Sequence, residues 1–508
     1  MRPAWEVVGL LKDGVVTPSE LIDVVERRLA EVEDLVHATP ITCFDRARAA
    51  AAKLQRPSSP PPGYLYGLPV LIKDSVPVAG VRWTEGSKIF EHRVAKESGP
   101  TAKRLEEMGA IVVGKTNVPE FCAGSQSFNE IFPTTVTPWD LRTTAGGSSG
   151  GAAAALASCQ CWLATGSDLG GSLRTPAAFC GIVGFRPTPG RASGGDPSAP
   201  RLWVHGTNGP MGRCVRDVGL LMDAMAGNFT WSFDWPPLPA GETYEAAALR
   251  GAAATSGWRV AFSTLGCTMR PELEALCRTA AKMLGGGVEA KDLPHSAIDL
   301  AAVEKAFLIL RGKTFAETFQ QTMANPLAAE VIKPEIQWNI ALGQQPEAPA
   351  LADAAQQDLS RLQDQVEALF QQVDILCVPT TRDAAFDAEV RYPVEQVGEA
   401  FSNYLGWMLP TFAGTVLLSP TVSLPVGFLP DGRPVGMQLL GPPGADAKVL
   451  EAAAYLEVLL NLPTACPEPR RGTVDLGTAG PRTKAEAKSH HEGEERRIVQ
   501  RFRTESRL

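Results

Sequence analysis

Two serine clusters flanked by glycine lie between residues 146 and 188. The first is Gly-Gly-Ser-Ser-Gly-Gly, which contains Ser148 and Ser149, and the second is Asp-Leu-Gly-Gly-Ser, which ends in Ser172. Because glycine lets a ligand approach backbone N–H groups, both clusters are typical of turns built for close contact. A serine hydroxyl becomes a nucleophile when a nearby base takes its proton, and this stretch contains no histidine. A flexible Gly/Ser turn is the simpler interpretation of either cluster alone.

Lys73 is a candidate for such a base. It follows the short apolar run 66–72, which is bounded by turn residues and predicts a buried strand. Burial lowers the pKa of a lysine, and a neutral lysine can accept a proton. A lysine at this place can also be purely structural, paired with the neighbouring Asp74 or reaching toward solvent. The local sequence leaves both alternatives open.

The segments around these residues alternate between helical and strand patterns. The small-residue run 152–157 predicts a tightly packed helix between the two serine clusters, and Thr17 to Glu20 has the form of a helix start. Further helices are expected at about 45–54, 101–108, 272–283 and 359–370, with buried strands at about 110–114, 258–262 and 374–379. This alternation predicts an α/β protein built on a sheet.

Composition and charge restrict the class of protein. The chain has 508 residues, of which 44% are hydrophobic and 20% charged, and its net charge of −8 comes with no basic stripe. A nucleic-acid partner is therefore not expected. Its ten cysteines lack C-x-x-C spacing and its histidines are isolated, so we expect reduced core cysteines and neither a metal site nor a cofactor. The N-terminus does not resemble a signal peptide and no apolar run is long enough to span a membrane, which favours a cytoplasmic location.

One large domain is expected over residues 1–466. It would consist of N-terminal helices at about 3–55, a core at about 64–230 and a C-terminal half at about 257–466. From 467 to 508 the sequence is charged and lacks apolar periodicity, which predicts a disordered tail.

Four motifs in this order carry a specific resemblance. They are GLPVLIKD, GKTNVPEF, AGGSSGGAAAAL and GSDLGGSLRTPAAFCGIVGFRPT, and matching segments continue to LSPTVSLPVGFLPDGRPVGMQLLG. The chain thereby resembles the amidase signature family, serine hydrolases that act on C–N bonds through a Ser–cis-Ser–Lys triad. The resemblance covers roughly residues 4–462 and implies an α/β fold with a mixed β-sheet core covered by helices on both faces.

The resemblance also implies roles for individual residues. Lys73 would be the base, Ser148 the middle serine on a cis peptide bond, and Ser172 the nucleophile. Backbone N–H groups of an oxyanion hole and three supporting residues are implied as follows: Leu169, Gly170, Gly171 and Ser172 for the hole, and Ser149, Asp168 and Arg174 for support. Aromatic residues in segments that the resemblance places near the substrate channel are expected as pocket walls: Phe128, Phe132, Trp139, Trp203, Trp338, Tyr404, Trp407 and Phe412.

The resemblance leaves two enzyme functions open. One is a hydrolase of hydrophobic or aryl amides, with carbamates (urethanes) as a second substrate class, that works through an acyl-enzyme on Ser172. The other is the ammonia-producing, glutaminase-type subunit of a tRNA-dependent amidotransferase. The aromatic residues favour the first function. A non-catalytic binding protein or a phosphate-binding loop protein is disfavoured, because GGSSGG lacks the Gly-Lys-Ser/Thr of a P-loop and all three triad positions are intact. A small-molecule substrate is expected, and the oligomeric state stays open, with a homodimer as one alternative.

Overall fold

The fold is taken from a computed structural model of the chain. It describes residues 1–194, 206–227, 235, 237–255, 257–294, 297–466, 468, 469, 497 and 498. Among these, no helix is both long and apolar enough to cross a membrane. All ten cysteines lie in the described part, and all ten are free thiols.

A mixed sheet forms the centre of the described structure, and its strands run in the order β1-β3-β2-β4-β6-β5-β12-β13-β9-β7-β8. The bounds of these strands, in chain order, are β1 Ile41–Thr42, β2 Pro69–Lys73, β3 Ile111–Thr116, β4 Leu163–Asp168, β5 Val183–Arg186, β6 Thr207–Gly212, β7 Val260–Phe262, β8 Lys291–Asp292, β9 Ile375–Pro379, β12 Thr421–Phe428 and β13 Pro434–Leu440. A separate hairpin consists of β10 Glu395–Gln396 and β11 Glu399–Ala400. The β2, β3 and β4 strands pair in parallel, whereas β6, β5, β12 and β13 pair antiparallel to their neighbours.

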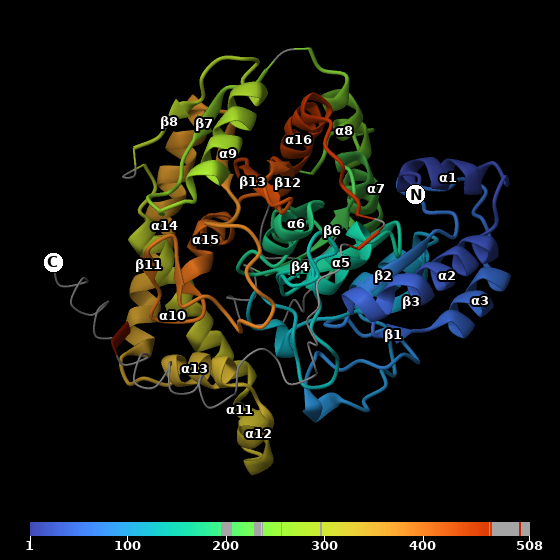
Figure 1. The fold of residues 1–508 in the computed structure, drawn as a ribbon, viewed down its shortest axis with the longest axis horizontal. Helices are drawn as coiled ribbons and strands as arrows, with labels where there is room; N and C mark the ends of the chain where they lie inside the picture. The colour runs from blue at the N-terminus through green and yellow to red at the C-terminus, as the bar shows by residue number, and fades with distance from the viewer. Residues whose placement is uncertain are drawn as a thin grey trace.

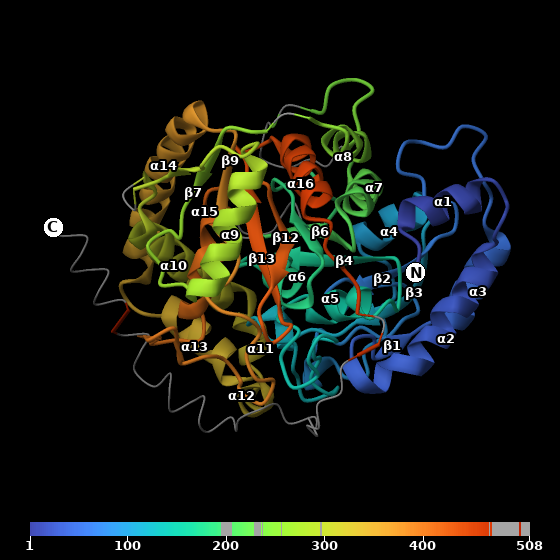
Figure 2. The same ribbon diagram turned by 45° about the horizontal axis from the view of Figure 1, so that its top comes forward.

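Helices pack against both faces of this sheet (Figure 1 and Figure 2). Their bounds are α1 Ala4–Lys12, α2 Pro18–Val36, α3 Phe44–Lys53, α4 Pro100–Glu107, α5 Gly150–Ala157, α6 Arg174–Cys180, α7 Val215–Met225, α8 Tyr244–Ala252, α9 Pro271–Leu284, α10 Leu300–Thr318, α11 Gln320–Met323, α12 Pro326–Val331, α13 Pro334–Gly343, α14 Ala348–Gln372, α15 Leu409–Val416 and α16 Asp446–Leu460. Short 3₁₀ helices are η1 Lys88–Phe90, η2 Glu120–Cys122 and η5 Gly406–Met408. The expected α/β fold with a mixed sheet is therefore confirmed.

Local sequence explains two helices that position the site. At the start of α2, Thr17 Oγ1 accepts the N–H of Glu20 at 3.3 Å and Glu20 Oε2 accepts the N–H of Thr17 at 2.8 Å, the reciprocal bonds of a capping box. All eight residues of α5 are buried, as its alanine-rich sequence predicts. A Cβ atom on Gly151 would lie 2.3 Å from the backbone nitrogen of Asn117, so only glycine permits this close approach.

The two larger of three apolar cores in the described structure support the sheet. The larger joins the N-terminal helices, α5 and the central strands. The second gathers residues of α10, α13, α14 and α15, which lie together on one side of the molecule in Figure 1. Of the expected tail, the structure describes residues 468, 469, 497 and 498, and Ile498 is buried in the second core. The burial of Ile498 differs from what a disordered tail predicts at that position. The other positions of 467–508 lie outside the described residues.

Candidate active site

The segments that carry Lys73, Ser148 and Ser172 meet at one edge of the sheet. Because β2 and β4 are parallel neighbours, their carboxyl ends point the same way. Lys73 is the last residue of β2 and Asp168 the last of β4, so both reach that edge. The loop before α5 brings Ser148 and Ser149 to the same place, and the loop between β4 and α6 brings Ser172.

Lys73 lies within hydrogen-bond distance of three serine hydroxyls. Its Nζ lies 2.7 Å from Ser148 Oγ, 2.8 Å from Ser149 Oγ and 2.9 Å from Ser167 Oγ. The side chain is fully buried, and among the described residues no carboxylate forms an ion pair with it. Burial lowers the pKa of Lys73 from its ordinary value. Cys122 and Asp168 act in the opposite direction, but burial outweighs them. The surroundings therefore favour a neutral amine, which can accept a proton.

Ser148 follows a cis peptide bond, Gly147–Ser148, as the resemblance implied. The carbonyl of Gly147 accepts a hydrogen bond from Ser125 Oγ at 2.9 Å. A Cβ atom on Gly147 would lie 2.8 Å from the backbone nitrogen of Gln126, so the glycine lets two loops touch. At the next turn the N–H of Gly150 donates to Ser127 Oγ at 3.1 Å. These contacts hold the serine pair at the end of α5, facing Lys73.

The loop around Ser172 is organised by the buried carboxylate of Asp168. This carboxylate accepts the N–H groups of Gly171 at 2.9 Å and Leu173 at 3.1 Å. Gly171 has φ +105°, a conformation that side chains rarely adopt, and a Cβ atom there would lie 2.5 Å from Thr411 Oγ1. The turn therefore depends on glycine and on the acidic residue three positions earlier.

The structure differs from the expected oxyanion hole at one position. The N–H of Gly171 already donates to the Asp168 carboxylate, which leaves it unavailable to a ligand. Among the described residues, the N–H groups of Leu169, Gly170 and Ser172 have no hydrogen-bond partner. The sequence could not show this difference because a Gly-Gly-Ser pattern does not reveal which N–H groups turn inward. Of the four N–H groups expected to form the oxyanion hole, those of Leu169, Gly170 and Ser172 remain available to a ligand.

Asp168 also neutralises two buried arginines. Arg174 donates to it from Nε at 3.0 Å and Nη2 at 2.9 Å, and Arg186 Nη1 lies 3.5 Å from it. Burial favours the protonated carboxyl, but the two guanidinium groups outweigh it and hold the pKa of Asp168 well below its usual range. Arg174 further donates to the carbonyl of Thr411 and to Gln438 Oε1. Asp168 and Arg174 thus hold the loop in position.

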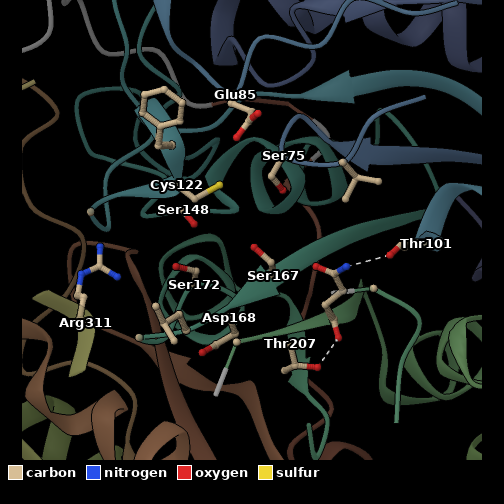
Figure 3. A pocket seen from close by; sticks show the side chains of 18 of the residues that line it. Ser75, Glu85, Thr101, Cys122, Ser148, Ser167, Asp168, Ser172, Thr207 and Arg311 are labelled. Atoms are coloured by element: carbon tan, nitrogen blue, oxygen red, sulfur yellow. Dashed lines mark hydrogen bonds between the residues drawn. The ribbon is translucent and has the colours of Figure 1, made fainter. Parts of the chain in front are cut away.

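A cavity of about 710 Å³ opens onto this edge. Ser148 and Ser172 both line it, and Figure 3 shows their hydroxyl groups facing the same space. Further residues that line this cavity include Glu85, Cys122, Ser167, Asp168, Leu169, Gly170, Phe307, Arg311, Phe315, Leu405 and Met408. The part of this wall that α10 contributes is mostly apolar. The volume of the cavity suits a small organic molecule.

The aromatic residues expected as pocket walls lie elsewhere. Of the seven that the structure describes, none lines the main cavity: Phe128, Phe132, Trp139, Trp338, Tyr404, Trp407 and Phe412. They pack into the interior instead; for example, Trp139 Nε1 donates to the carbonyl of Cys180 at 2.7 Å. Tyr404 and Phe412 lie one layer behind the wall. Tyr404 Oη accepts a hydrogen bond from Arg311, and the Phe412 ring stacks on the Phe307 ring with their centres 3.8 Å apart. Trp203 lies outside the described residues.

Sequence reasoning missed five residues of the site. Ser167 contacts Lys73 directly, and Cys122 lines the cavity. Phe307, Arg311 and Phe315 come from one face of α10, where they recur every four residues. That spacing was a usable signal, because an arginine between two phenylalanines on one helix face is unusual in a core. Ser167 offered no such signal.

The chain is similar to known proteins in both sequence and fold. Residues 20–450 match the Amidase family. A glutamyl-tRNA(Gln) amidotransferase subunit of Moorella thermoacetica is 33% identical over 484 residues, which cover 89% of this chain and 96% of that protein. The corresponding amidotransferase subunit of Symbiobacterium thermophilum is also 33% identical over 484 residues, which cover 90% of this chain and 97% of that protein.

Two solved structures share the fold. A 6-aminohexanoate cyclic dimer hydrolase, complexed with substrate, superposes with a TM-score of 0.80 at 26% identity, covering 92% of this chain and 98% of the other. A bacterial aryl acylamidase of the amidase signature enzymes also has a TM-score of 0.80, at 24% identity, covering 90% and 96%. Because the family match spans most of the chain, and the curated relatives align almost end to end, the chain belongs to the amidase signature family and is a serine hydrolase acting on C–N bonds.

Proposed function

We propose that this protein hydrolyses linear amides through an acyl-enzyme on Ser172. The observation that supports it most is the cluster of Lys73 Nζ with three serine hydroxyls, at 2.7–2.9 Å, directly behind a cavity lined by Ser148 and Ser172. A buried lysine that has no carboxylate partner in the described part of the chain, and that is held against serines, suits proton transfer better than a structural role.

In the proposed first step, Ser172 Oγ attacks the amide carbonyl carbon. The hydroxyl proton of Ser172 passes to Ser148 Oγ while the proton of Ser148 passes to neutral Lys73. The carbonyl oxygen becomes an oxyanion, which the N–H groups of Leu169, Gly170 and Ser172 would stabilise by about 3–4 kcal/mol each.

In the second step the C–N bond breaks. The nitrogen of the leaving amine takes a proton from Lys73 through Ser148, which leaves the acyl group as an ester on Ser172. Water then attacks this ester, and the proton of the water passes through Ser148 to Lys73. The acid departs as Ser172 Oγ takes a proton back from the same relay. Substrate enters as amide and water and leaves as acid and amine, so atoms balance.

The apolar part of the wall favours hydrophobic or aryl amides, with carbamates as a second class. Phe307, Phe315, Leu405 and Met408 provide this surface. Burying one aromatic ring of a substrate against it contributes about 2–3 kcal/mol, enough to favour an aryl over a small polar group by roughly a hundredfold.

A second candidate function is the glutaminase-type subunit of a tRNA-dependent amidotransferase. The observation that favours it is the near end-to-end match to the two glutamyl-tRNA(Gln) amidotransferase subunits. In that case glutamine would be the amide, and a partner protein would receive the ammonia.

Two experiments test these proposals. After treatment with a fluorophosphonate, mass spectrometry should find the adduct on the peptide that contains Ser172; an adduct on Ser148 or Ser149 would overturn the assigned nucleophile. Comparing kcat/KM for an acyl anilide, an aryl carbamate and glutamine separates the functions. A preference for glutamine, especially one that needs a partner protein, would replace the first function with the second.

A further inference from the structure

Arg311 places a guanidinium group in the wall of the cavity. It lies on α10 between Phe307 and Phe315, four residues from each, and all three line the cavity. Figure 3 shows it on the opposite side of the cavity from Glu85, with Ser148 and Ser172 between the two in that view. The residue is only 8% exposed, so its charge is almost removed from bulk water.

The contacts of Arg311 are with neutral groups. Its Nε donates to Asn339 Oδ1 at 3.1 Å and its Nη2 donates to Tyr404 Oη at 3.2 Å. Its carbon Cζ lies 4.3 Å from the centre of the Phe315 ring. Among the described residues, no acidic side chain forms an ion pair with it. Since a guanidinium has five N–H groups, donors remain for a ligand.

Three carboxylates around the cavity form ion pairs with other arginines. Glu85, across the cavity, pairs with Arg93 at 2.6 Å. Asp168 pairs with Arg174 at 2.9 Å. Behind the wall, Glu335 pairs with the guanidinium of Arg391. A nearly buried cation with only neutral partners is costly, and such a charge is normally neutralised by a carboxylate or a ligand.

The neutral contacts also fix the position of Arg311. Asn339 Nδ2 donates to Tyr404 Oη at 2.6 Å and to the backbone carbonyl of Glu335 at 2.6 Å. The two side chains that hold the guanidinium are therefore themselves held. A planar guanidinium fixed in this way is suited to bidentate recognition of a carboxylate.

We propose that Arg311 binds a carboxylate of the substrate, so that this enzyme acts on amides that carry an acidic group away from the scissile bond. The inference rests on the proposed amide hydrolysis and adds the chemical class of substrate to it. Phe307 and Phe315 would contact the apolar part of the same molecule, with Arg311 between them reading its charge.

The first test compares acidic substrates with neutral ones of the same shape. Succinyl, glutaryl and adipoyl 4-nitroanilides would be measured beside the matching anilides in which a carboxamide replaces the carboxylate. A charge-assisted contact should favour the acid at one length by about tenfold to a hundredfold in kcat/KM. Arg311→Gln should remove this preference and Arg311→Lys should keep part of it. Lys313→Gln, which removes a cation from the same helix outside the cavity wall, should leave the preference unchanged.

A second arm places the acid on the amine side of the bond. The hexanoyl amides of 4-aminobenzoate and 4-aminobenzamide form the matched pair. An Arg311-dependent preference in this pair, and not in the first, assigns the carboxylate to the leaving group. The reverse assigns it to the acyl group, and both results support the inference. If the wild-type protein hydrolyses these substrates without a preference in either pair, or if the preference survives in Arg311→Gln, the inference is wrong.

Binding without turnover separates this inference from the proposed function. Calorimetry with Ser172→Ala measures affinity for the same acidic anilides and for 4-hexanamidobenzoate when no bond can break. Binding that disappears in Ser172→Ala/Arg311→Gln supports the anion site even if the wild-type protein hydrolyses none of the anilides, an outcome that would count against amide hydrolysis alone. Equal binding by the single and double variants would overturn the anion site.

Discussion

Replacing Lys73 by methionine should abolish activity while leaving the fold stable. Methionine has a similar volume but no basic nitrogen, and a positioned base contributes roughly 10²–10⁴-fold to the rate. We therefore expect kcat to fall by about 10³-fold or more, which corresponds to about 4 kcal/mol of activation free energy. Lys73→Arg should be equally inactive, because a guanidinium stays protonated at every accessible pH.

The stability of Lys73→Met follows from the contacts of the lysine. The variant loses three hydrogen bonds to hydroxyls, each contributing about 0.5–1.5 kcal/mol. It also ends the cost of burying an amine that lacks a carboxylate partner, which offsets much of that loss. Ser149 keeps other partners, since its Oγ accepts the N–H of Ser167 and donates to the carbonyl of the same residue. The expected net change in the free energy of unfolding is within about 2 kcal/mol.

Lys115→Met is the matched control. Lys115 is also fully buried, but its Nζ lies 2.6 Å from Asp74, whose carboxylate is buried as well. Removing this amine leaves an uncompensated buried charge, which costs about 3–5 kcal/mol. Chemical denaturation followed by circular dichroism compares the two variants, and labelling of Ser172 by a fluorophosphonate measures activity. If Lys73→Met keeps activity within tenfold of the wild type, or is destabilised as much as Lys115→Met, the reasoning fails.

Three further outcomes are expected. As pH rises through the lowered pKa of Lys73, the amine loses its proton, so kcat/KM should rise from acid pH and then level off; a rate that falls over this range would contradict the role as base. Gly171→Ala should slow labelling of Ser172 by about a hundredfold, because the new Cβ would displace the loop from Thr411. Asp168→Asn should lower the free energy of unfolding by about 3–5 kcal/mol, since Arg174 then lacks its counterion, as a shift in the denaturation midpoint will show.

Two substitutions serve as controls for Gly171→Ala and Asp168→Asn. Gly14→Ala also changes a glycine at positive φ, +71°, but its Cβ would meet nothing within 4 Å, so labelling of Ser172 should not change. Asp431→Asn breaks the surface pair with Arg433, a change expected to cost about 1 kcal/mol or less. Equal effects from a control and its test variant would show that the proposed contact is not responsible.

The sequence predicted the local geometry around Lys73, Ser148 and Ser172 better than the cavity wall. The short apolar run before Lys73 predicted a buried strand, and β2 ends at that lysine. The glycines around Ser148 and Ser172 predicted close backbone approach, which the contacts of Gly147 and Gly171 explain. Such residues are predictable because their chemistry and backbone geometry are local.

The cavity wall depended on long-range packing. An aromatic residue fills a core and lines a pocket equally well, so Trp139 and Trp407 could not be assigned from their type. Arg311 becomes informative only when Asn339 and Tyr404, from later segments, are seen to contact it, while no carboxylate among the described residues forms an ion pair with it. The occupied N–H of Gly171 likewise depends on where the Asp168 carboxylate turns.

The anchoring of Arg174 has a consequence for synthesis of the chain. Its guanidinium donates to the carbonyl of Thr411 and to Gln438, which lie 237 and 264 positions further on, and Thr411 Oγ1 in turn holds the carbonyl of Gly170. The strands β12 and β13 also enter the middle of the sheet, beside β5. The ribosome therefore completes the serine and lysine signature long before the groups that fix its geometry exist. A nonsense codon between Thr188 and Gln438 should therefore yield an inert product that still carries Lys73, Ser148 and Ser172.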